Sequence, residues 1–475
     1  MQDTPGWNPG RPWQTHASTY RSHEMQLLAR WIGVGISGSV VGLHGSGKSD
    51  LLGFLCHRTD VLSTYLPNQA QTIFLLPVDL NNLPARTLSA LYRVILRAFY
   101  EQRGRFDSDS RTLIAQHYQE NRAVVDPFLP QSALRELLLH FQARGDRLVF
   151  VLDRFDAACR MLTPEMGDTL RGLRDSFKST LSYIAGMRQT LAYLPDPALI
   201  GDLYRLLDAH ICYVGPLTEA DTRTIIAQHV NSNGASPDEA QRTRIWALTG
   251  GYPSLLRIVC RWWVMNTYTP PLEQWTQLLC AEPGVRYRLD DIWAGLTQEE
   301  QMVLSEVQRI GTLTKTARRA ARAALYQRHD AIVRTLTALR LCRLVDEDLE
   351  LFCELFAAHV VEVGAYSRGK IVLDEQTQEL YQGEQPLTTL TPTEFAILRF
   401  LVQQPRIRHP YSAIIAGAWA DEVNYAGVST ENLHQVIRGL RQKIEPDPAQ
   451  PVYIVNWRGK PEGGYQFFPE GKPRA

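Results

Sequence analysis

The sequence predicts a multidomain α/β protein, with a doubly wound parallel sheet and a helical lid followed by two small helix-and-hairpin domains. Three observations support this prediction. The 475 residues are enough for about three domains. Apolar runs of strand length alternate with helical stretches from residue 20 to about 215, as in parallel sheets covered on both faces. From Leu217 onward, helical periodicity replaces the strand pattern.

The composition excludes several classes of protein. Hydrophobic residues make up 44% and charged residues 21%, which is ordinary for a globular chain and excludes wholesale disorder or a collagen-like repeat. Lys plus Arg and Asp plus Glu both number 50, so a nucleic-acid or acidic partner must be held by a local patch. The seven cysteines are scattered, and no apolar run approaches about 18 residues. We therefore expect a cytoplasmic protein with reduced cysteines and no membrane segment.

Composition and periodicity divide the chain into five segments. We expect a flexible, Pro- and Gly-rich arm at 1–16, an α/β core at 17–215, a helical lid at 216–292, a middle domain at 293–363 and a terminal domain at 366–475.

Each segment has its own expected elements. In the core we expect a helix at 20–32, strands at 39–41, 72–79, 147–153, 181–186 and 209–214, and a helix from Asp50. The lid contributes helices at 218–230, 237–248 and 252–267. The middle domain has helices at 297–311 and 330–344 and a strand at 349–352. The terminal domain has short strands at 370–390, three helices within 391–446 and a hairpin at 452–469.

A glycine-rich loop joins the first strand to the next helix. Its residues 42–49, GLHGSGKS, fit the pattern G-x-x-x-x-G-K-[ST]. Such a loop points backbone N–H groups at phosphate oxygens, its lysine adds charge, its hydroxyl ligates Mg²⁺ and the helix contributes its positive end. We therefore predict ATP or ADP binding by Gly42, His44, Gly45, Ser46, Gly47, Lys48, Ser49 and Asp50.

Two carboxylates follow the strand at 147–153. Asp153 lies at a strand end, where Mg²⁺ bound to a phosphate chain takes a protein oxygen, so we assign the metal to Ser49 and Asp153. The alternative for Asp153 is a helix N-cap. Asp156 either polarises the attacking water or caps the next helix, and the sequence does not separate these roles.

These segments resemble the nucleotide-binding region of the STAND signalling ATPases over about 17–363. The resemblance rests on the loop at 42–49, LVFVLDRFD at 148–156, LSYIAGMR at 181–188, VGPLTEADTRTII at 214–226 and GGYP at 250–253. It implies that Arg188 senses the γ-phosphate and that Pro253 approaches the nucleotide from the lid. The alternatives are a strand-end surface charge for Arg188 and a helix C-cap for Gly250 and Gly251.

The chain departs from the family pattern at two places. Arg154 occupies the position after Asp153 where many related ATPases have a catalytic Glu, and residues 22–24 read Ser-His-Glu in place of Gly-Arg-Glu. We therefore expect slow hydrolysis, with nucleotide marking a state of the protein.

The middle domain resembles the winged-helix segment that follows the ATPase core in STAND proteins. It carries a basic cluster, which is either a DNA contact or a solvated helix face, at Lys315, Arg318, Arg319 and Arg322.

The terminal domain contains a helix with one apolar and one polar face. A capping box at Thr391 and Glu394 starts an earlier helix, and residues 428–445 form the helix in question. Its polar face is rich in donors that read base edges, and we predict DNA contacts by Asn432, Gln435, Arg438, Arg441 and Gln442.

Residues 366–469 resemble the OmpR/PhoB-type winged-helix DNA-binding domain. The matching segments are LTPTEFAILRFLVQQP at 390–405, AW at 418–419, IRGLRQKIEPDP at 437–448, YIVNWRG at 453–459 and GGYQF at 463–467. The resemblance implies that the helix enters the major groove while Arg458 and Lys460 reach phosphates from the wing, whose tip is longer than usual. The alternative is a winged helix that binds only protein.

Together these features predict an ATP-responsive transcription regulator that binds double-stranded DNA and is nucleoid-associated when bound. The DNA-reading region is weakly basic, so a homo-oligomer formed on activation would help binding, with a protein or small molecule as trigger. The alternative is a STAND ATPase that acts in defence or mobile-element biology by partner-triggered oligomerisation. A P-loop kinase lacks an acceptor-substrate motif here.

Overall fold

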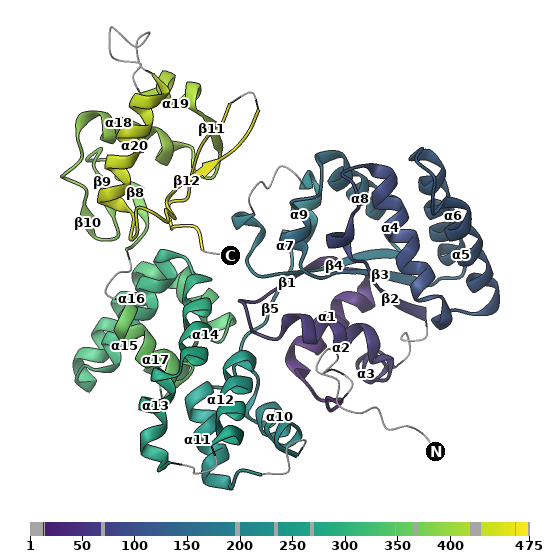
Figure 1. Cartoon of the computed structure of the whole chain (residues 1–475), viewed down its shortest axis with the longest axis horizontal. Coiled ribbons are helices and arrows are strands. Elements are labelled where there is room, and N and C mark those ends of the chain that lie inside the picture. Colours follow the sequence, from purple (N-terminus) through teal and green to yellow (C-terminus); the bar gives the residue numbers. More distant parts are fainter. Residues whose placement is uncertain are drawn as a thin grey trace. The chain divides into compact units, whose positions relative to one another are not determined.

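The chain folds into two compact units, one ending at Glu273 and the other beginning at Gln274. The computed structural model describes residues 13, 15–67, 72–194, 200–231, 236–266, 270–346, 348–364, 368–418, 429–460 and 462–473. Figure 1 shows the helices and strands of both units.

The first unit is built on a five-stranded parallel sheet with the order β2-β3-β4-β1-β5. The strands are β1 (Gly38–Val41), β2 (Ile73–Pro77), β3 (Arg147–Leu152), β4 (Leu181–Met187) and β5 (Ile211–Tyr213). All five predicted strands are confirmed. Because the sheet is parallel, the loops that follow β1, β3 and β4 leave it at the same edge.

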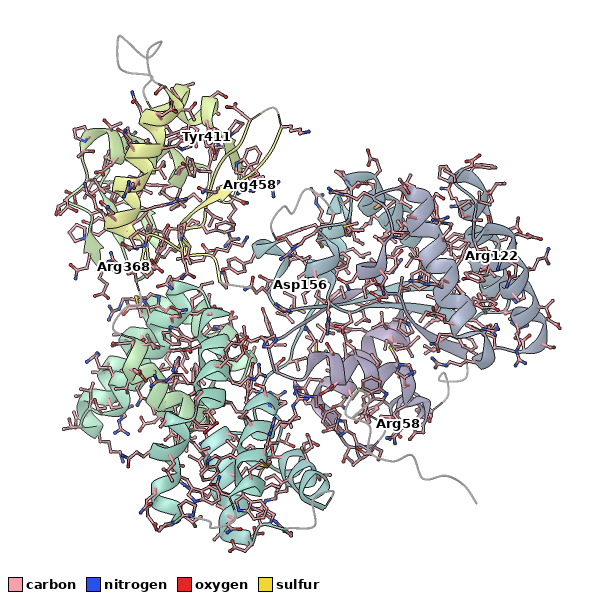
Figure 2. All side chains as sticks on the ribbon, viewed as in Figure 1. Arg58, Arg122, Asp156, Arg368, Tyr411 and Arg458 are labelled. Atoms are coloured by element: carbon pink, nitrogen blue, oxygen red, sulfur yellow. The ribbon has the colours of Figure 1, made fainter. Side chains whose placement is uncertain are left out.

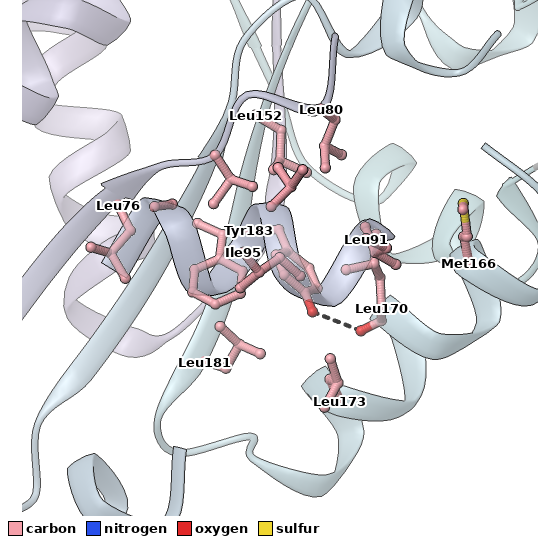
Figure 3. Close-up of a cluster of buried hydrophobic side chains, with 14 of the residues drawn as sticks. Leu76, Leu80, Leu91, Ile95, Leu152, Met166, Leu170, Leu173, Leu181 and Tyr183 are labelled. Carbon is pink, nitrogen blue, oxygen red and sulfur yellow. Dashed lines mark hydrogen bonds between the residues drawn. The ribbon is translucent and has the colours of Figure 1, made fainter. Parts of the chain in front are cut away.

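Helices cover both faces of this sheet. They are α1 (Ser22–Val34), α2 (Lys48–His57), α3 (Thr59–Tyr65), α4 (Leu88–Glu101), α5 (Ser108–Asn121), α6 (Phe128–Ala143), α7 (Phe155–Ala158), α8 (Pro164–Ser176) and α9 (Leu203–Asp208). In Figure 1, α1 and α2 lie on one face and α4, α8 and α9 on the other, which confirms the doubly wound fold. Between α4, α8 and the sheet lies an apolar core, where the Tyr183 hydroxyl donates a hydrogen bond of 2.7 Å to the Leu170 carbonyl (Figure 3).

Three helices of the first unit follow β5. They are α10 (Glu219–Asn231), α11 (Glu239–Thr249) and α12 (Pro253–Met265). Gly250 caps α11 in a left-handed conformation, φ 54°, as the C-cap alternative proposed. A Cβ on Gly251 would lie 2.6 Å from Thr222 Oγ1, so the chain turns tightly into Pro253.

The second unit begins with helices and a hairpin. These are α13 (Trp275–Ala281), α14 (Pro283–Ala294), α15 (Gln298–Gly311), α16 (Lys315–Ala338), β6 (Cys342–Val345), β7 (Asp348–Leu351) and α17 (Glu354–Val363). The helix predicted over 330–344 is confirmed from Asp330 to Ala338 but ends there, so its C-terminal end was wrong. The helix begins at Lys315 and bends at His329 (φ −131°, ψ 31°), and its first half buries only Leu325, so its apolar periodicity starts late. Residues 342–345 pair as a strand.

The basic cluster of α16 is partly structural. Arg318 and Arg322 lie 2.6 and 3.5 Å from the Asp348 carboxylate of the hairpin. Lys315 and Arg319 are exposed. Two of the four cations therefore hold the hairpin against the helix.

The rest of the second unit is a small domain with two three-stranded sheets, β10-β9-β8 and β11-β13-β12. Its elements are β8 (Ile371–Leu373), β9 (Leu380–Gln382), β10 (Gln385–Pro386), α18 (Pro392–Gln403), β11 (Arg408–Pro410), α19 (Tyr411–Ala418), α20 (Thr430–Ile444), β12 (Ile454–Trp457) and β13 (Gly464–Phe467). The capping box of Thr391 and Glu394 forms. Trp419, residues 365–367 of the expected linker and the expected helix start at 428 lie outside the described residues.

Some expectations concern the whole chain. Among the described residues, no helix is long and apolar enough to span a membrane. All seven cysteines are free, and every one except Cys280 is buried. Within the expected arm, Trp13 stacks on His57 with ring centroids 5.6 Å apart. The domain boundaries inside each unit stay predictions.

Candidate functional sites

The loop between β1 and α2 has the backbone of a phosphate cradle. Gly45 and Gly47 have left-handed φ values of 79° and 85°. A Cβ on Gly45 would lie 2.3 Å from Ser254 Oγ, and one on Gly42 would lie 2.5 Å from Ser46 Oγ. Only glycine fits at these positions. The loop ends at the N-terminus of α2, whose partial positive charge favours an anion.

Three successive carbonyl oxygens of this loop accept hydrogen bonds from outside it. The pairs are the Tyr252 hydroxyl with His44 (2.8 Å), the Ser254 N–H with Gly45 (3.1 Å) and the Arg21 guanidinium with Ser46. The C=O and N–H of a trans peptide point in opposite directions. These bonds therefore direct the N–H groups of Gly45 and Gly47 to the other side of the loop.

Arg21 is a residue that the sequence interpretation missed. It lies directly before α1 with a left-handed φ of 50°, and its buried side chain pairs with Glu24 at 3.0 Å. The guanidinium also donates to the Gly215 carbonyl at 3.1 Å, and the Arg21 N–H donates to Asp221 at 3.3 Å. The available signal was an arginine three residues before a glutamate at the start of an amphipathic helix.

The predicted catalytic residues gather around Lys48. Asp153 follows β3 and accepts the N–H of Arg154 at 2.9 Å. Asp156, labelled in Figure 2, lies in α7 and accepts the N–H of Arg188 at 3.3 Å, so it ties α7 to the end of β4. Burial lowers the pKa of Lys48, while the carboxylates of Asp153 and Asp156 oppose that change. The structure thus brings the cations of Lys48, Arg154 and Arg188 and the carboxylates of Asp153 and Asp156 to the sheet edge beside the loop.

The other predicted nucleotide ligands lie on the loop, on α2 and on the lid. His44 and Ser49 are exposed, and Asp50 is half-buried. Burial raises the pKa of Asp50, which the charges of Arg257 and Arg21 oppose. Pro253 is buried against the loop, since a Cβ on Gly47 would lie 3.2 Å from its Cγ.

The residues of this cradle fit a nucleotide phosphate chain. The Ser46 hydroxyl is buried and has no hydrogen-bond partner among the described residues. The left-handed glycines let Ser254 and Pro253 of the lid approach the loop, and Lys48 begins α2 at the end of the loop. An unsatisfied donor, backbone N–H groups and a cation are what bound phosphate oxygens require.

Helix α20 presents a polar face in the second unit. Ser429 caps it by accepting the Asn432 N–H at 3.3 Å. Its apolar face is buried in the domain core through Leu433, Ile437 and Leu440. Four of the five predicted reader side chains are exposed on the helix, namely Asn432, Gln435, Arg438 and Gln442.

Arg441 differs from the other predicted reader residues. Its guanidinium donates to the Ile454 carbonyl (Nε 3.1 Å) and to Asn456 Oδ1 (2.7 Å), and it stacks over the Tyr465 ring. It therefore fastens the C-terminal half of α20 to β12. Arg458 and Lys460 are exposed beyond β12, and Figure 2 shows Arg458 near the end of this hairpin.

These features define a protein with a P-loop nucleotide unit, whose lid is bonded to its phosphate loop, and a winged-helix region with an exposed polar helix. The chain belongs to the family described as Novel STAND NTPase 1, which it matches over residues 21–363. Residues 383–467 match the C-terminal domain of transcriptional regulatory proteins.

Two bacterial relatives match the terminal region. The uncharacterized transcriptional regulatory protein YrkP of Bacillus subtilis is 33% identical over 99 residues, which are 21% of this chain and 40% of YrkP. A probable transcriptional regulatory protein of Picosynechococcus sp. is 31% identical over 93 residues, 20% of this chain and 34% of the relative. The chain thus spans less than half the length of these relatives.

Solved structures with P-loop domains are also similar. A Walker-type ATPase of Pyrococcus abyssi has a TM-score of 0.37 at 14% identity and covers 72% of this chain and 95% of its own. The ORC2 protein of Aeropyrum pernix, in ADPNP–ADP complexes, has a TM-score of 0.38 at 16% identity, with coverages of 73% and 93%. Likenesses of this size add nothing to the family assignment.

Proposed function

We propose that this protein is a transcription regulator in which the nucleotide bound by the first unit determines whether α20 binds double-stranded DNA. ATP then favours the DNA-competent state, because it binds that state more tightly. On DNA, the protein is associated with the nucleoid.

The nucleotide site combines the loop, α2 and the lid. The loop N–H groups and Lys48 hold the phosphates, and Ser49 and Asp153 supply oxygens for Mg²⁺, which neutralises phosphate charge. Arg154 follows Asp153, where many related ATPases have a glutamate, and its N–H donates to the Asp153 carboxylate at 2.9 Å. Without a glutamate there, hydrolysis is slow and Arg188 serves to distinguish ATP from ADP.

The DNA site combines α20 and the hairpin. Asn432, Gln435, Arg438 and Gln442 reach base edges, because amide and guanidinium groups match adenine and guanine in the major groove. Arg458 and Lys460 contact phosphates. Since few cations lie on this face, two or more copies bind together for adequate affinity.

One observation carries the proposal. The carbonyl of Glu470, after the last strand, accepts the N–H groups of Gln298 (3.0 Å) and Glu299 (3.4 Å) at the start of α15. The Gln298 side chain also accepts the N–H of Arg368 at 3.2 Å. The DNA-reading domain is thus bonded to the helices that follow the lid in the chain, so a movement of those helices reaches it.

The test is a selection of bound fragments from random duplex DNA by the full chain, with ATP, with ADP and without nucleotide, followed by titration of the enriched sequence. We expect one enriched motif and tighter binding with ATP. No enrichment in any condition would contradict the DNA role. Sizing chromatography with ATP would then show whether nucleotide-driven assembly without DNA is the output.

A further inference from the structure

We infer that Tyr252 is a positioning residue that holds the lid on the phosphate loop and thereby slows nucleotide exchange. This inference rests on the nucleotide site proposed above. It assigns the coupling between lid and loop to one hydroxyl group.

Tyr252 is anchored in the lid and reaches the loop with its tip. The side chain is 1% exposed, and its N–H donates to the Thr249 carbonyl at 2.9 Å. Its hydroxyl donates to the His44 carbonyl at 2.8 Å. A Cβ on Gly45 would lie 3.5 Å from a ring carbon, so the ring also packs along the loop. The residue therefore has its backbone in the lid and a side-chain hydrogen bond to the phosphate loop.

A second bond supports the same contact. The first N–H groups of a helix have no partner inside the helix. Helix α12 has no side-chain cap, and the Ser254 N–H in its first turn donates to the Gly45 carbonyl at 3.1 Å. The phosphate loop thus caps the lid helix. Separating lid and loop breaks both bonds, and the loss of each buried hydrogen bond is unfavourable.

The two bonds oppose changes in the loop. The His44 carbonyl that accepts the Tyr252 hydroxyl belongs to the peptide that carries the Gly45 N–H. The Gly45 carbonyl belongs to the peptide of the Ser46 N–H, which donates within the loop to the Leu43 carbonyl at 3.1 Å. Each bond to the lid therefore resists a change in the orientation of these loop peptides on release of a phosphate chain. Loss of the hydroxyl alone should therefore loosen the loop while the fold and Pro253 stay in place.

The experiment measures release of a fluorescent mant-ADP from the full chain by stopped flow, in wild type, Tyr252→Phe and Tyr183→Phe. The second variant is a matched control. It removes a tyrosine hydrogen bond to a backbone carbonyl of similar length, 2.7 Å, buried in the same unit but within the core (Figure 3). We expect release to be about five-fold faster in Tyr252→Phe, the effect of one lost hydrogen bond, and unchanged in Tyr183→Phe.

Each outcome decides the inference. Wild-type release from Tyr252→Phe overturns it, and equal acceleration in both variants overturns it in favour of a general loss of stability. A measurement on the wild type avoids the risk that a variant misfolds: nucleotide should slow hydrogen exchange at the Ser254 amide, and no change would contradict the contact.

The release rates test the role of Tyr252 separately from the proposed control of DNA binding by ATP. If wild-type DNA binding ignores ATP while Tyr252→Phe still releases mant-ADP faster, the proposed function fails and the role of Tyr252 stands. If ATP tightens DNA binding but Tyr252→Phe releases mant-ADP at the wild-type rate, the proposed function stands and the role of Tyr252 fails.

Discussion

Arg21 and Glu24 form an ion pair of 3.0 Å in which the side chains are 1% and 2% exposed. The same guanidinium donates to the carbonyls of Ser46 and Gly215. One side chain therefore joins the start of α1, the phosphate loop and the segment that leads into the lid.

Removing this arginine should destabilise the first unit strongly. Arg21→Ala leaves the Glu24 carboxylate buried without its cation, which costs about 3–5 kcal/mol. Thermal unfolding of the full chain measures the effect. Arg97→Ala, at an exposed pair with Glu101, should change stability by about 0.5 kcal/mol or less. A loss of under about 1 kcal/mol in Arg21→Ala would contradict the structural role, and Arg21→Met with Glu24→Gln should recover part of the stability.

The two arginines of α20 should separate DNA affinity from stability. Arg438 is exposed, so Arg438→Ala should weaken specific DNA binding by about 1–3 kcal/mol and leave the melting temperature unchanged. Arg441→Ala should lower the melting temperature of the second unit, because it frees the Ile454 carbonyl and Asn456. Gel-shift titration beside calorimetry measures both effects. Wild-type DNA affinity in Arg438→Ala, or an unchanged melting temperature in Arg441→Ala, would contradict these assignments.

The contact between Gly471, which follows the last strand, and Gln298 of α15 should transmit the effect of ATP to the DNA-binding domain. Gly471 has a φ of 75°, and a Cβ there would lie 2.7 Å from Gln298 Cγ. Gly471→Ala should reduce the effect of ATP on DNA affinity, measured by fluorescence anisotropy, without abolishing DNA binding. Gly145→Ala is the control, because that residue has a similar φ of 73° and nothing within 4 Å of its Cβ position. An undiminished ATP effect in Gly471→Ala would show that the contact carries no signal.

The second unit should become less stable as the pH rises from about 4.5 to 7. Burial and the neighbouring carboxylates of Glu299 and Glu470 raise the pKa of Glu300 from 4.5 to about 7. A carboxyl with a raised pKa in the folded state contributes its full stability below its unfolded pKa and loses it as the pH passes the folded pKa. Glu300→Gln keeps the capping box with Thr297 and should remove roughly 2 kcal/mol of this dependence. Urea unfolding of wild type and Glu300→Gln at pH 5 and pH 8 measures this dependence. An equal loss of stability between the two pH values in both proteins would contradict the prediction.

The strands of the core and the phosphate loop were predictable because local signals specify them. Each strand is an apolar run with turn residues beside it, and the loop follows a fixed glycine and lysine pattern. Helix α16 was not fully predictable, because its first half pairs Arg318 and Arg322 with Asp348 and so has little apolar periodicity.

The contacts of individual side chains depend on tertiary structure and were harder to predict from the sequence. Asp153 and Arg188 were expected at strand ends, and Asp156 just after the same strand as Asp153. Parallel topology puts these strand ends at one edge, where the Asp156 carboxylate accepts the Arg188 N–H. Tyr252 and Arg441 act through partners 208 and 13 residues away, the carbonyls of His44 and Ile454. Backbone carbonyls leave no mark in the sequence, so neither contact could be predicted from residue types.

The most direct test of nucleotide control is the affinity of the full chain for its selected DNA with and without ATP and Mg²⁺, in wild type and in Lys48→Ala. The account predicts that ATP tightens wild-type binding by about ten-fold and does nothing to Lys48→Ala. Equal wild-type affinities in both conditions, at saturating nucleotide, would contradict it.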